Sequence, residues 1–248
     1  MKISDIEVTL IDHMGSDLSV VNAARVSFHK TSEWEWNLQP EFRGIEDMVE
    51  KASLSDKDTK LINYLAKHKH FSPFNHAFMT FRIKAPIFVA RQLVKHKFMP
   101  WNEVSRRYVD EEPEFYFPEY WRAKAENVKQ GSSNTEFIST IQRSTKDGKE
   151  QVWDSPVDFV TTRYCEHAVS IYSDMLLSGV SPEQARMILP QNMMTEWMWS
   201  GTLGAYADML KLRLDPHTQY ESRIVAEKVV ERVRELFPVS INALLENK

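Results

Sequence analysis

The chain has 248 residues, 42% of them hydrophobic, which is enough apolar material to bury a substantial core in one large domain or two small ones. A net charge of −4 and a pI near 6.1 argue against a general nucleic-acid-binding protein, because such proteins carry an excess of positive charge. The single cysteine, Cys165, excludes an internal disulfide framework, and the absence of a signal peptide and of any run of roughly 18 apolar residues favours a cytoplasmic protein outside the membrane.

The first part of the chain combines one clear strand pattern with a long stretch that has no period. Apolar and polar residues alternate over residues 5–11, which predicts a half-buried strand. Gly15 and the N-cap candidates Ser16 and Asp17 then predict a turn into a short helix. Residues 29–54 are rich in Trp, Glu and Pro, so we expect a long, partly ordered loop or insertion that ends in a short helix.

The next segment contains the clearest strand of the sequence, between two predicted helices. A capping-box pattern at residues 55–58 predicts the start of the first helix. Strict alternation over residues 76–84 predicts the strand. Pro86 suits the first turn of the second helix, where its missing N–H is not needed, and Pro100 would stop that helix after about Lys97.

The second half of the chain is mainly helical by pattern. Residues 122–155 are polar and indicate an excursion with one helix, and residues 192–199 alternate as a strand does. Further helices are predicted at 157–177, from 182 to just before 190, at 201–213 and at 217–236. Because strands are few and interspersed with helices, the fold class is α/β or α+β, helix-rich, in a single domain over residues 1–248.

Residues 91–108 form the most informative segment. They hold six cationic groups, counting His96, together with the polar side chains of Gln92, Asn102, Glu103 and Ser105. Lys and Arg neutralise phosphate, and amide, hydroxyl and carboxylate groups can contact the edge of a base or a flavin ring. The segment therefore suits a phosphorylated ligand rich in amide edges, although a solvated basic surface strip is the simpler alternative.

This segment also carries a family resemblance. Lys95-His96-Lys97, seven further residues and Ser105 closely resemble the signature of flavin-dependent thymidylate synthases, which is normally Arg-His-Arg, seven residues and Ser. The match extends outward to Arg91-Gln92 on one side and Arg107-Tyr108 on the other. Both arginines of the triplet are lysines in this chain, so the charge is kept but the planar two-pronged donor is lost.

A second segment, residues 68–76, holds His68, His70 and His76. No cysteine lies nearby and the His-x-x-x-His spacing of helical zinc sites is absent, so we predict no metal site. A similar His-x-x-Pro-Phe-x-His stretch contacts the flavin in the family, and the resemblance implies FAD contacts for His70 and Ser72. His76 begins an alternating strand, which favours a hydrogen-bonded structural role.

Two arginines downstream resemble nucleotide contacts of the family. Arg186 stands in the family's Ala-Arg-x-x-Leu-Pro pattern, where the arginine binds the nucleotide; an arginine that snorkels from a short helix is the alternative. Residues 212–221 resemble the family's Leu-Arg-x-Asp-x-His-x-Gln-x-Glu pattern. By that resemblance Arg213 lies beside the pyrimidine and favours ionisation of N3, because a guanidinium stabilises the developing imide anion, and His217 contacts the flavin.

The chain departs from the family between these two blocks. Where the family presents Asn, Arg and Asn as further flavin contacts, this chain has Thr202, Gly204 and Asp208. These contacts would be weakened or rebuilt, and Asp208 would face the cofactor as an acid instead of an amide.

A fifth block completes the resemblance. Residues 17–28 fit the family's N-terminal helix, in which Ser27 lies close to FAD. The five blocks follow one another in order over nearly the whole chain. The segments 29–54 and 122–155 lie outside them and are expected to be insertions.

The resemblance implies an FAD-dependent methyltransferase of dTMP biosynthesis, which converts dUMP to dTMP with methylenetetrahydrofolate as carbon donor and NADPH as reductant. Its fold would be a helix-rich domain with a small, mostly antiparallel sheet, and it would form homotetramers with shared active sites. Arg213 would be the catalytic residue. The implied dUMP contacts are Gln92, Lys95, Glu103, Ser105, Arg106, Arg107, Arg186 and Arg213. The implied FAD contacts are Ser27, His70, Ser72, Lys95, His96, Lys97, Glu103, Thr202, Gly204, Asp208, Leu212 and His217.

Two other functions fit parts of the sequence. A metal-dependent nucleotide hydrolase would use His68, His70, His76 and Asp215, and would hold metal without a yellow colour. An RNA-binding module would stack bases on Phe98, Trp101 and Tyr108, although the acidic net charge counts against it.

Cys165 raises a third question, because the common thymidylate synthase attacks uracil with a cysteine thiolate. Nothing near Cys165 in the sequence marks its thiol as activated, so we expect it to pack in the interior. The sequence also lacks the glycine-rich motifs of Rossmann and P-loop phosphate sites.

Overall fold

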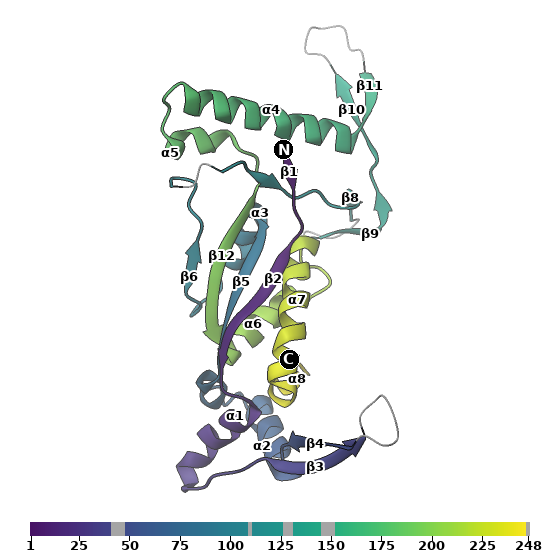
Figure 1. The fold of residues 1–248 in the computed structure, drawn as a ribbon. Helices are drawn as coiled ribbons and strands as arrows, with labels where there is room; N and C mark the ends of the chain where they lie inside the picture. The colour runs from purple at the N-terminus through teal and green to yellow at the C-terminus, as the bar shows by residue number, and fades with distance from the viewer. Residues whose placement is uncertain (41–47, 109–110, 126–130, 145–151, 247–248) are drawn as a thin grey trace.

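A four-stranded antiparallel sheet forms the centre of the molecule (Figure 1). The computed structural model describes residues 1–40, 48–108, 111–125, 131–144 and 152–246. The strand order is β2-β5-β12-β6, and the bounds are β2 Glu7–Met14, β5 Phe78–Pro86, β12 Met194–Thr202 and β6 Trp101–Glu103. The fold is therefore mixed helix and sheet, with a small, mostly antiparallel sheet as expected.

The alternating pattern of the two central strands supplies the core. Ile83 pairs with Trp197 and Phe81 with Trp199 across β5 and β12, and all four side chains are buried. Trp101 of β6 stacks on Trp197 with ring centroids 4.4 Å apart and planes inclined by 18°. Large apolar side chains on one face of paired strands contact each other directly, so these pairs fix the register of the sheet.

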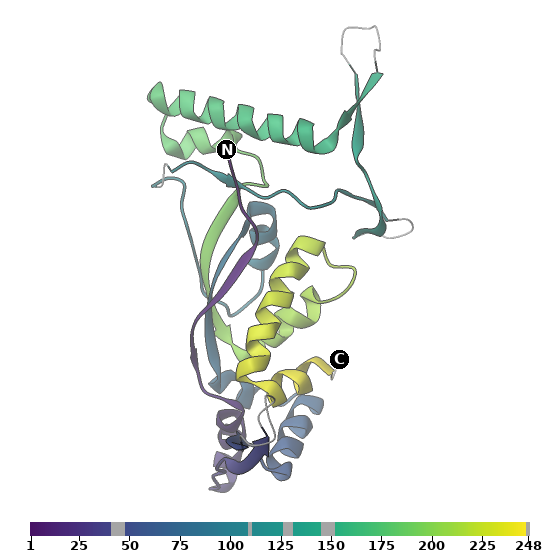
Figure 2. The same cartoon turned by 45° about the vertical axis from the view of Figure 1, so that its right-hand side comes forward.

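Helices packed beside the sheet complete the hydrophobic core. In Figure 2, α6, α7 and α8 lie along one side of the sheet, and α3 packs against β5 and α7. Their bounds are α3 Ile87–Leu93, α6 Leu203–Arg213, α7 Tyr220–Leu236 and α8 Pro238–Glu246. Within the described residues, no helix is long and apolar enough to cross a membrane.

The two ends of the molecule are built from different parts of the chain (Figure 1). One end holds α1 Asp17–Arg25, α2 Asp56–Lys67, the hairpin of β3 Glu35–Pro40 and β4 Met48–Ser53, and the 3₁₀ turns Val26–Phe28 and Ser72–His76. The other end holds α4 Val157–Leu177, α5 Pro182–Ala185, the 3₁₀ turn Arg186–Ile188, the pair β1 Lys2–Ile3 with β7 Glu114–Phe115, and the hairpins described next.

Two hairpins occupy the described part of residues 122–155. The first joins β8 Arg122–Lys124 to β9 Ser132–Phe137, and the second joins β10 Thr140–Ser144 to β11 Val152–Pro156. The first hairpin reaches the C-terminal part of the chain, because Gly131 approaches the backbone of His217. The segment 122–155, predicted from its composition to be a polar excursion, thus contacts the loop around His217.

A buried carboxylate ties the first helix to the last one. Asp17 is 3% exposed, and its side-chain oxygens accept hydrogen bonds from the backbone N–H groups of Val239 and Ser240, both at 2.9 Å. These donors belong to the first turn of α8, where backbone N–H groups lack partners within the helix. Burial raises the pKa of the Asp17 carboxyl, and the bonds from α8 oppose that rise.

Several predicted elements are confirmed. The helix at 157–177 is α4, and Gly179 follows it with φ of +84°. The strands at 76–84 and 192–199 exist but are shifted by two or more residues toward the C-terminus. Ser55 caps α2, since its side chain accepts the N–H of Asp58.

Other predictions are wrong. The helix after Pro86 ends at Leu93 and not near Lys97, because the chain must turn before Trp101 to place β6 beside β12. The expected short helix at the end of residues 29–54 is strand β4, which pairs along its length with β3. The expected helix in 122–155 is absent from the described part, where strands pair instead. Helix α8 was not predicted; Pro238 opens it directly after α7 ends.

Candidate active site

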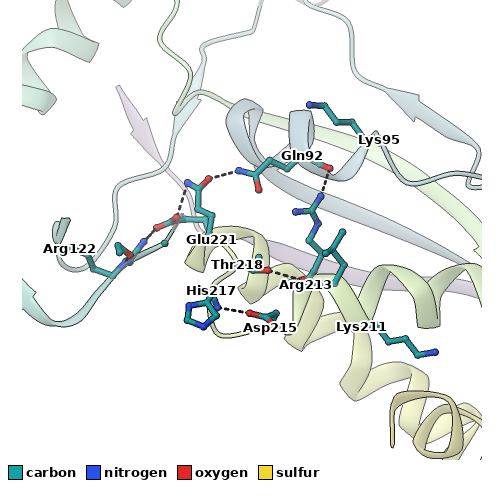
Figure 3. A pocket seen from close by; sticks show the side chains of 13 residues that line it. Gln92, Lys95, Arg122, Lys211, Arg213, Asp215, His217, Thr218 and Glu221 are labelled. Carbon is teal, nitrogen blue, oxygen red and sulfur yellow. Dashed lines mark hydrogen bonds and ion pairs between the residues drawn. The ribbon is translucent and has the colours of Figure 1, made fainter. Parts of the chain in front are cut away.

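A cleft of about 760 Å³ opens where α3, the end of α6, the start of α7 and the β8–β9 hairpin meet (Figure 3). It collects Gln92, Lys95, Leu212, Arg213 and His217, which are five of the residues predicted to contact dUMP or FAD. Residues that the sequence patterns did not single out also line it: Arg122, Gly131, Ser132, Lys211 and Thr218. Figure 3 shows Lys95 and Lys211 on one side of Arg213, and Arg122 with Glu221 on the other.

Three cations form one wall of the cleft, which we call the Arg213 wall: Lys95, Lys211 and Arg213. Arg213 donates from Nε to Nε2 of His96 at 3.0 Å and from a terminal nitrogen to the backbone carbonyl of Gln92 at 2.9 Å. Both acceptors are neutral groups. In the part of the chain that the structure describes, no ion pair joins any of the three cations to a carboxylate, so their charge is available to a ligand.

His96 is held as a neutral base behind Arg213. Burial and the nearby positive charge of Arg213 lower the pKa of His96 to about 4. At neutral pH its Nε2 is therefore an acceptor for the guanidinium, and the proton of the imidazole is on Nδ1. Burial also lowers the pKa of Arg213, but a guanidinium stays protonated at any ordinary pH.

The loop after α6 places His217 at the edge of the cleft. Arg213 ends α6, where a cation suits the negative end of the helix dipole. The carboxylate of Asp215 accepts the backbone N–H of His217 at 2.8 Å, and the hydroxyl of Thr218 donates to the carbonyl of Leu212 at 2.8 Å. These two bonds fold the loop tightly and leave the His217 ring exposed.

The opposite side of the cleft, which we call the Arg122 wall, consists of Arg122, Ser132, Gln219 and Glu221. Arg122 and Glu221 form an ion pair at 2.5 Å, and their side chains are 15% and 5% exposed. Arg122 also donates to the Ser132 hydroxyl at 2.8 Å, and Gln219 donates to Glu221 at 3.2 Å. In contrast to Arg213, Arg122 has its charge balanced by a carboxylate.

A second cavity, of about 740 Å³, lies between α1 and α2. It gathers Ser27, His70 and Ser72, which the family resemblance assigned to FAD, together with Lys30 and Tyr64. The three predicted residues come from segments more than forty positions apart and are brought together by the packing of α1 on the 3₁₀ turn Ser72–His76.

The rest of the predicted dUMP contacts lie outside both cavities. The carboxylate of Glu103 accepts from the Thr195 hydroxyl at 2.8 Å and from the Trp101 indole at 3.0 Å. Arg186 is exposed and donates to the carbonyl of Glu183 at 3.2 Å. The other residues of this group are Ser105, Arg106 and Arg107, which follow β6.

Besides Glu103, five of the predicted FAD contacts lie outside the cavities: His96, Lys97, Thr202, Gly204 and Asp208. Lys97 and Asp208 are exposed, whereas Thr202 caps α6 and donates to Asn75 at 2.8 Å. At Gly204, an added Cβ would lie 2.6 Å from the Asn75 amide oxygen, so a larger residue there would displace the Asn75 side chain. A single chain therefore assembles only part of the predicted site.

Cys165 packs with Phe115 and Met193, apart from both cavities, and burial raises the pKa of its thiol. The interpretation of Cys165 as an interior residue is confirmed, since it is 2% exposed. Among the described residues, no group of three or more His, Cys, Asp or Glu side chains could hold a metal ion. The ligand set of the hydrolase hypothesis, His68, His70, His76 and Asp215, is thus not assembled there.

The sequence and the fold are both similar to those of known proteins. The family described as "Thymidylate synthase complementing protein" matches residues 9–239. The flavin-dependent thymidylate synthase of Thermosipho africanus is 33% identical over 237 residues, covering 96% of this chain and 90% of that protein. The protein of the same name from Thermus thermophilus is 34% identical over 240 residues, covering 97% and 76%.

A solved structure extends the likeness to the fold. The UMP/dUMP methylase PolB from Streptomyces cacaoi, bound with 5-Br dUMP, superposes with a TM-score of 0.71 at 30% identity, covering 98% of this chain and 96% of that chain. The fold of this chain is thus shared with a solved nucleotide methylase. The chain belongs to the flavin-dependent thymidylate synthase family. The hydrolase and RNA-binding hypotheses are therefore set aside.

Proposed function

We propose that this protein is an FAD-dependent thymidylate synthase, which methylates dUMP to dTMP with methylenetetrahydrofolate and NADPH as co-substrates. The observation that supports this most is the Arg213 wall. Arg213 is half-buried, it is held by neutral acceptors, and it keeps a full positive charge inside a cleft large enough for a nucleotide. A cation of this kind stabilises negative charge that develops on a bound ring.

Arg213 would act on the pyrimidine of dUMP. Carbon C5 of uracil becomes a better nucleophile as N3 loses its proton, because electron density moves into the ring. A permanent cation beside that edge stabilises the resulting imide anion, and the partly buried setting strengthens the interaction. Neutral His96 and the Gln92 carbonyl hold the guanidinium in place without cancelling its charge.

The residues of both cavities suit FAD. Lys95 and Lys211 offer ammonium groups with no hydrogen-bond or ion-pair partner among the described residues, as a diphosphate requires, and His217 is exposed beside them. The second cavity adds the hydroxyls of Ser27 and Ser72. FAD, when bound, would supply the redox chemistry, and the protein would supply position and charge. The remaining implied contacts are His70, His96, Lys97, Glu103, Thr202, Gly204, Asp208 and Leu212.

We further propose a homotetramer in which subunits share active sites. Ser105, Arg107 and Arg186 suit the phosphate of dUMP by residue type, yet they lie outside both cavities of their own chain. A neighbouring subunit could present them to the cleft. Mixing Arg213→Ala and Arg186→Ala proteins tests this, because a hybrid site could contain both wild-type residues. Activity recovered after subunit exchange supports a shared site, and its absence despite proven exchange contradicts it.

The direct test of the proposed function uses purified protein. We expect flavin absorption bands near roughly 370 and 450 nm, the positions of the free oxidised cofactor. With NADPH, methylenetetrahydrofolate and dUMP, we expect dTMP; omission of any one should abolish its formation. A folded protein that binds no FAD at any tested concentration would overturn the proposal.

A further inference from the structure

We infer that Arg122 is a positioning residue that sets the orientation of the Gln92 amide, and with it the preference of the cleft for uracil over cytosine. This inference rests on the proposed function, because it concerns how dUMP is recognised. It arises from a series of hydrogen bonds that links β8 to α3 through the Arg122 wall (Figure 3). Arg122 belongs to the segment that the sequence suggested was an insertion.

The series of hydrogen bonds begins with a pair in which donor and acceptor cannot exchange roles. Arg122 can only donate, and Glu221, when ionised, can only accept. Arg122 is itself fixed by the Ser132 hydroxyl and by the ring of Tyr220, which lies 4.5 Å from its guanidinium carbon. Because Glu221 is 4% exposed, the ionised pair is stable only while both members are present.

Glu221 fixes which group donates and which accepts in the two amides that follow it. Gln219 must turn its NH₂ group toward Glu221, and its carbonyl oxygen therefore faces Gln92. Gln92 must then donate from its own NH₂ group to that oxygen. The carbonyl oxygen of Gln92 in turn accepts the Ser222 hydroxyl at 3.1 Å. If either amide turned over, like groups would face each other along the chain, so each amide has one favoured orientation.

The last member of the chain touches the proposed substrate site. Gln92 lines the cleft, and its backbone carbonyl accepts from Arg213. After its bonds to Gln219 and Ser222, its side chain retains one N–H and one lone pair, in fixed positions. Uracil and cytosine differ by exchange of donor and acceptor at N3 and at the exocyclic group of C4. An amide of fixed polarity can match one of them and oppose the other.

The test interrupts the series of hydrogen bonds at two places and measures how well the protein discriminates between dUMP and dCMP. The double variant Arg122→Gln with Glu221→Gln keeps a hydrogen-bonding pair without an unpaired buried charge, but its new amide can point either way. Gln219→Ala leaves the ion pair intact and removes the middle of the chain. For both proteins we expect the ratio of dCMP to dUMP dissociation constants to fall by about tenfold, with FAD still bound. Arg122→Lys, which keeps a charged donor, should retain most of the ratio.

The control is the exposed pair on the outer surface of α7, changed in the same way to Arg232→Gln with Glu235→Gln, which should leave the ratio unchanged. If dUMP affinity falls in both test proteins while the ratio stays constant, Arg122 only supports the wall and the inference is wrong. Unchanged affinity and ratio would also overturn it. A wild-type protein that binds FAD but does not bind dUMP would refute the proposed function itself, which separates the two failures.

Discussion

The two walls of the cleft each contain an arginine, and the two arginines are held in opposite ways. Arg122 meets the carboxylate of Glu221 at 2.5 Å, whereas Arg213 meets an imidazole nitrogen and a peptide carbonyl. A guanidinium paired with a carboxylate presents little net charge, and it orients the groups around it. A guanidinium held by neutral acceptors keeps its charge for a ligand. The partner of each arginine therefore indicates its role better than its depth in the protein.

The largest effect should follow from removing the charge of Arg213, which pairs with no carboxylate among the described residues. Arg213→Ala should lower the rate of the chemical step about a hundredfold, or about 3 kcal/mol, because a charge that stabilises the transition state is lost. Arg213→Lys should recover only part of the rate, since an ammonium cannot hold both His96 and the Gln92 carbonyl in the same geometry. Single-turnover oxidation of reduced flavin, with dUMP and the folate present, measures this step. Unchanged turnover in folded Arg213→Ala protein would remove the catalytic assignment.

Lys211 tests whether the Arg213 wall attracts anions as a whole. Lys211→Ala should weaken binding of a phosphorylated ligand by about tenfold at low salt and by less at high salt, because an ammonium without a counter-ion attracts phosphate through a screened field. The matched control is Lys228→Ala, an exposed lysine of α7 that does not line the cleft. Equal losses in the two variants would show that the effect comes from net charge and not from the wall.

His96 should make the Arg213 wall sensitive to acid. Its pKa is about 4 in the folded protein and near the ordinary 6.5 in the unfolded chain, so between these values the unfolded chain binds the extra proton. The free energy of unfolding should therefore fall as the pH drops from about 6.5 toward 4. His96→Gln keeps an acceptor for Arg213 but cannot titrate, and should lose less stability over this window. Urea unfolding at pH 7 and 5 measures the difference; equal acid losses in the two proteins would contradict it.

The smallest effect should come from a residue outside both walls. Cys165→Ala should leave turnover unchanged, because burial raises the thiol pKa and Asn192 is its polar neighbour at 3.6 Å. Removing the sulfur from a packed cluster should cost about 1 kcal/mol of stability. Initial rates and thermal unfolding of the variant measure the two effects. Lost activity in folded protein would show that the thiol takes part in the reaction.

The sequence predicted those parts of the fold that depend on local periodicity. The strands β5 and β12 and the helix α4 follow from alternation or from helical spacing, with Gly179 marking an end. The hairpins of residues 122–155 were missed, because short polar strands gain their stability from pairing and carry little pattern of their own. Helix α8 was missed although Pro238 marks its start; the side chain that accepts its first N–H groups is Asp17, at the other end of the chain.

The sequence singled out those cleft residues that lie within a contiguous motif. Gln92, Lys95, Arg213 and His217 fall in two such motifs, and the fold brings them into one cleft. Arg122 was missed because its partner Glu221 is 99 positions away, and no local pattern marks such a pair. Lys211 could have been found, since it precedes the Leu-Arg pattern directly and lies in the last turn of its helix.

The contact between Asp17 and α8 constrains the order in which the parts of the protein can fold during synthesis. The acceptor emerges from the ribosome early, and its donors Val239 and Ser240 follow 222 and 223 residues later. Until then the carboxylate has no replacement for the water it would lose on burial, so α1 cannot settle into its final place. Completion of the domain must therefore wait until synthesis of α8. A nascent chain truncated before Pro238 should expose α1 to proteases and to chaperones that recognise unfinished proteins.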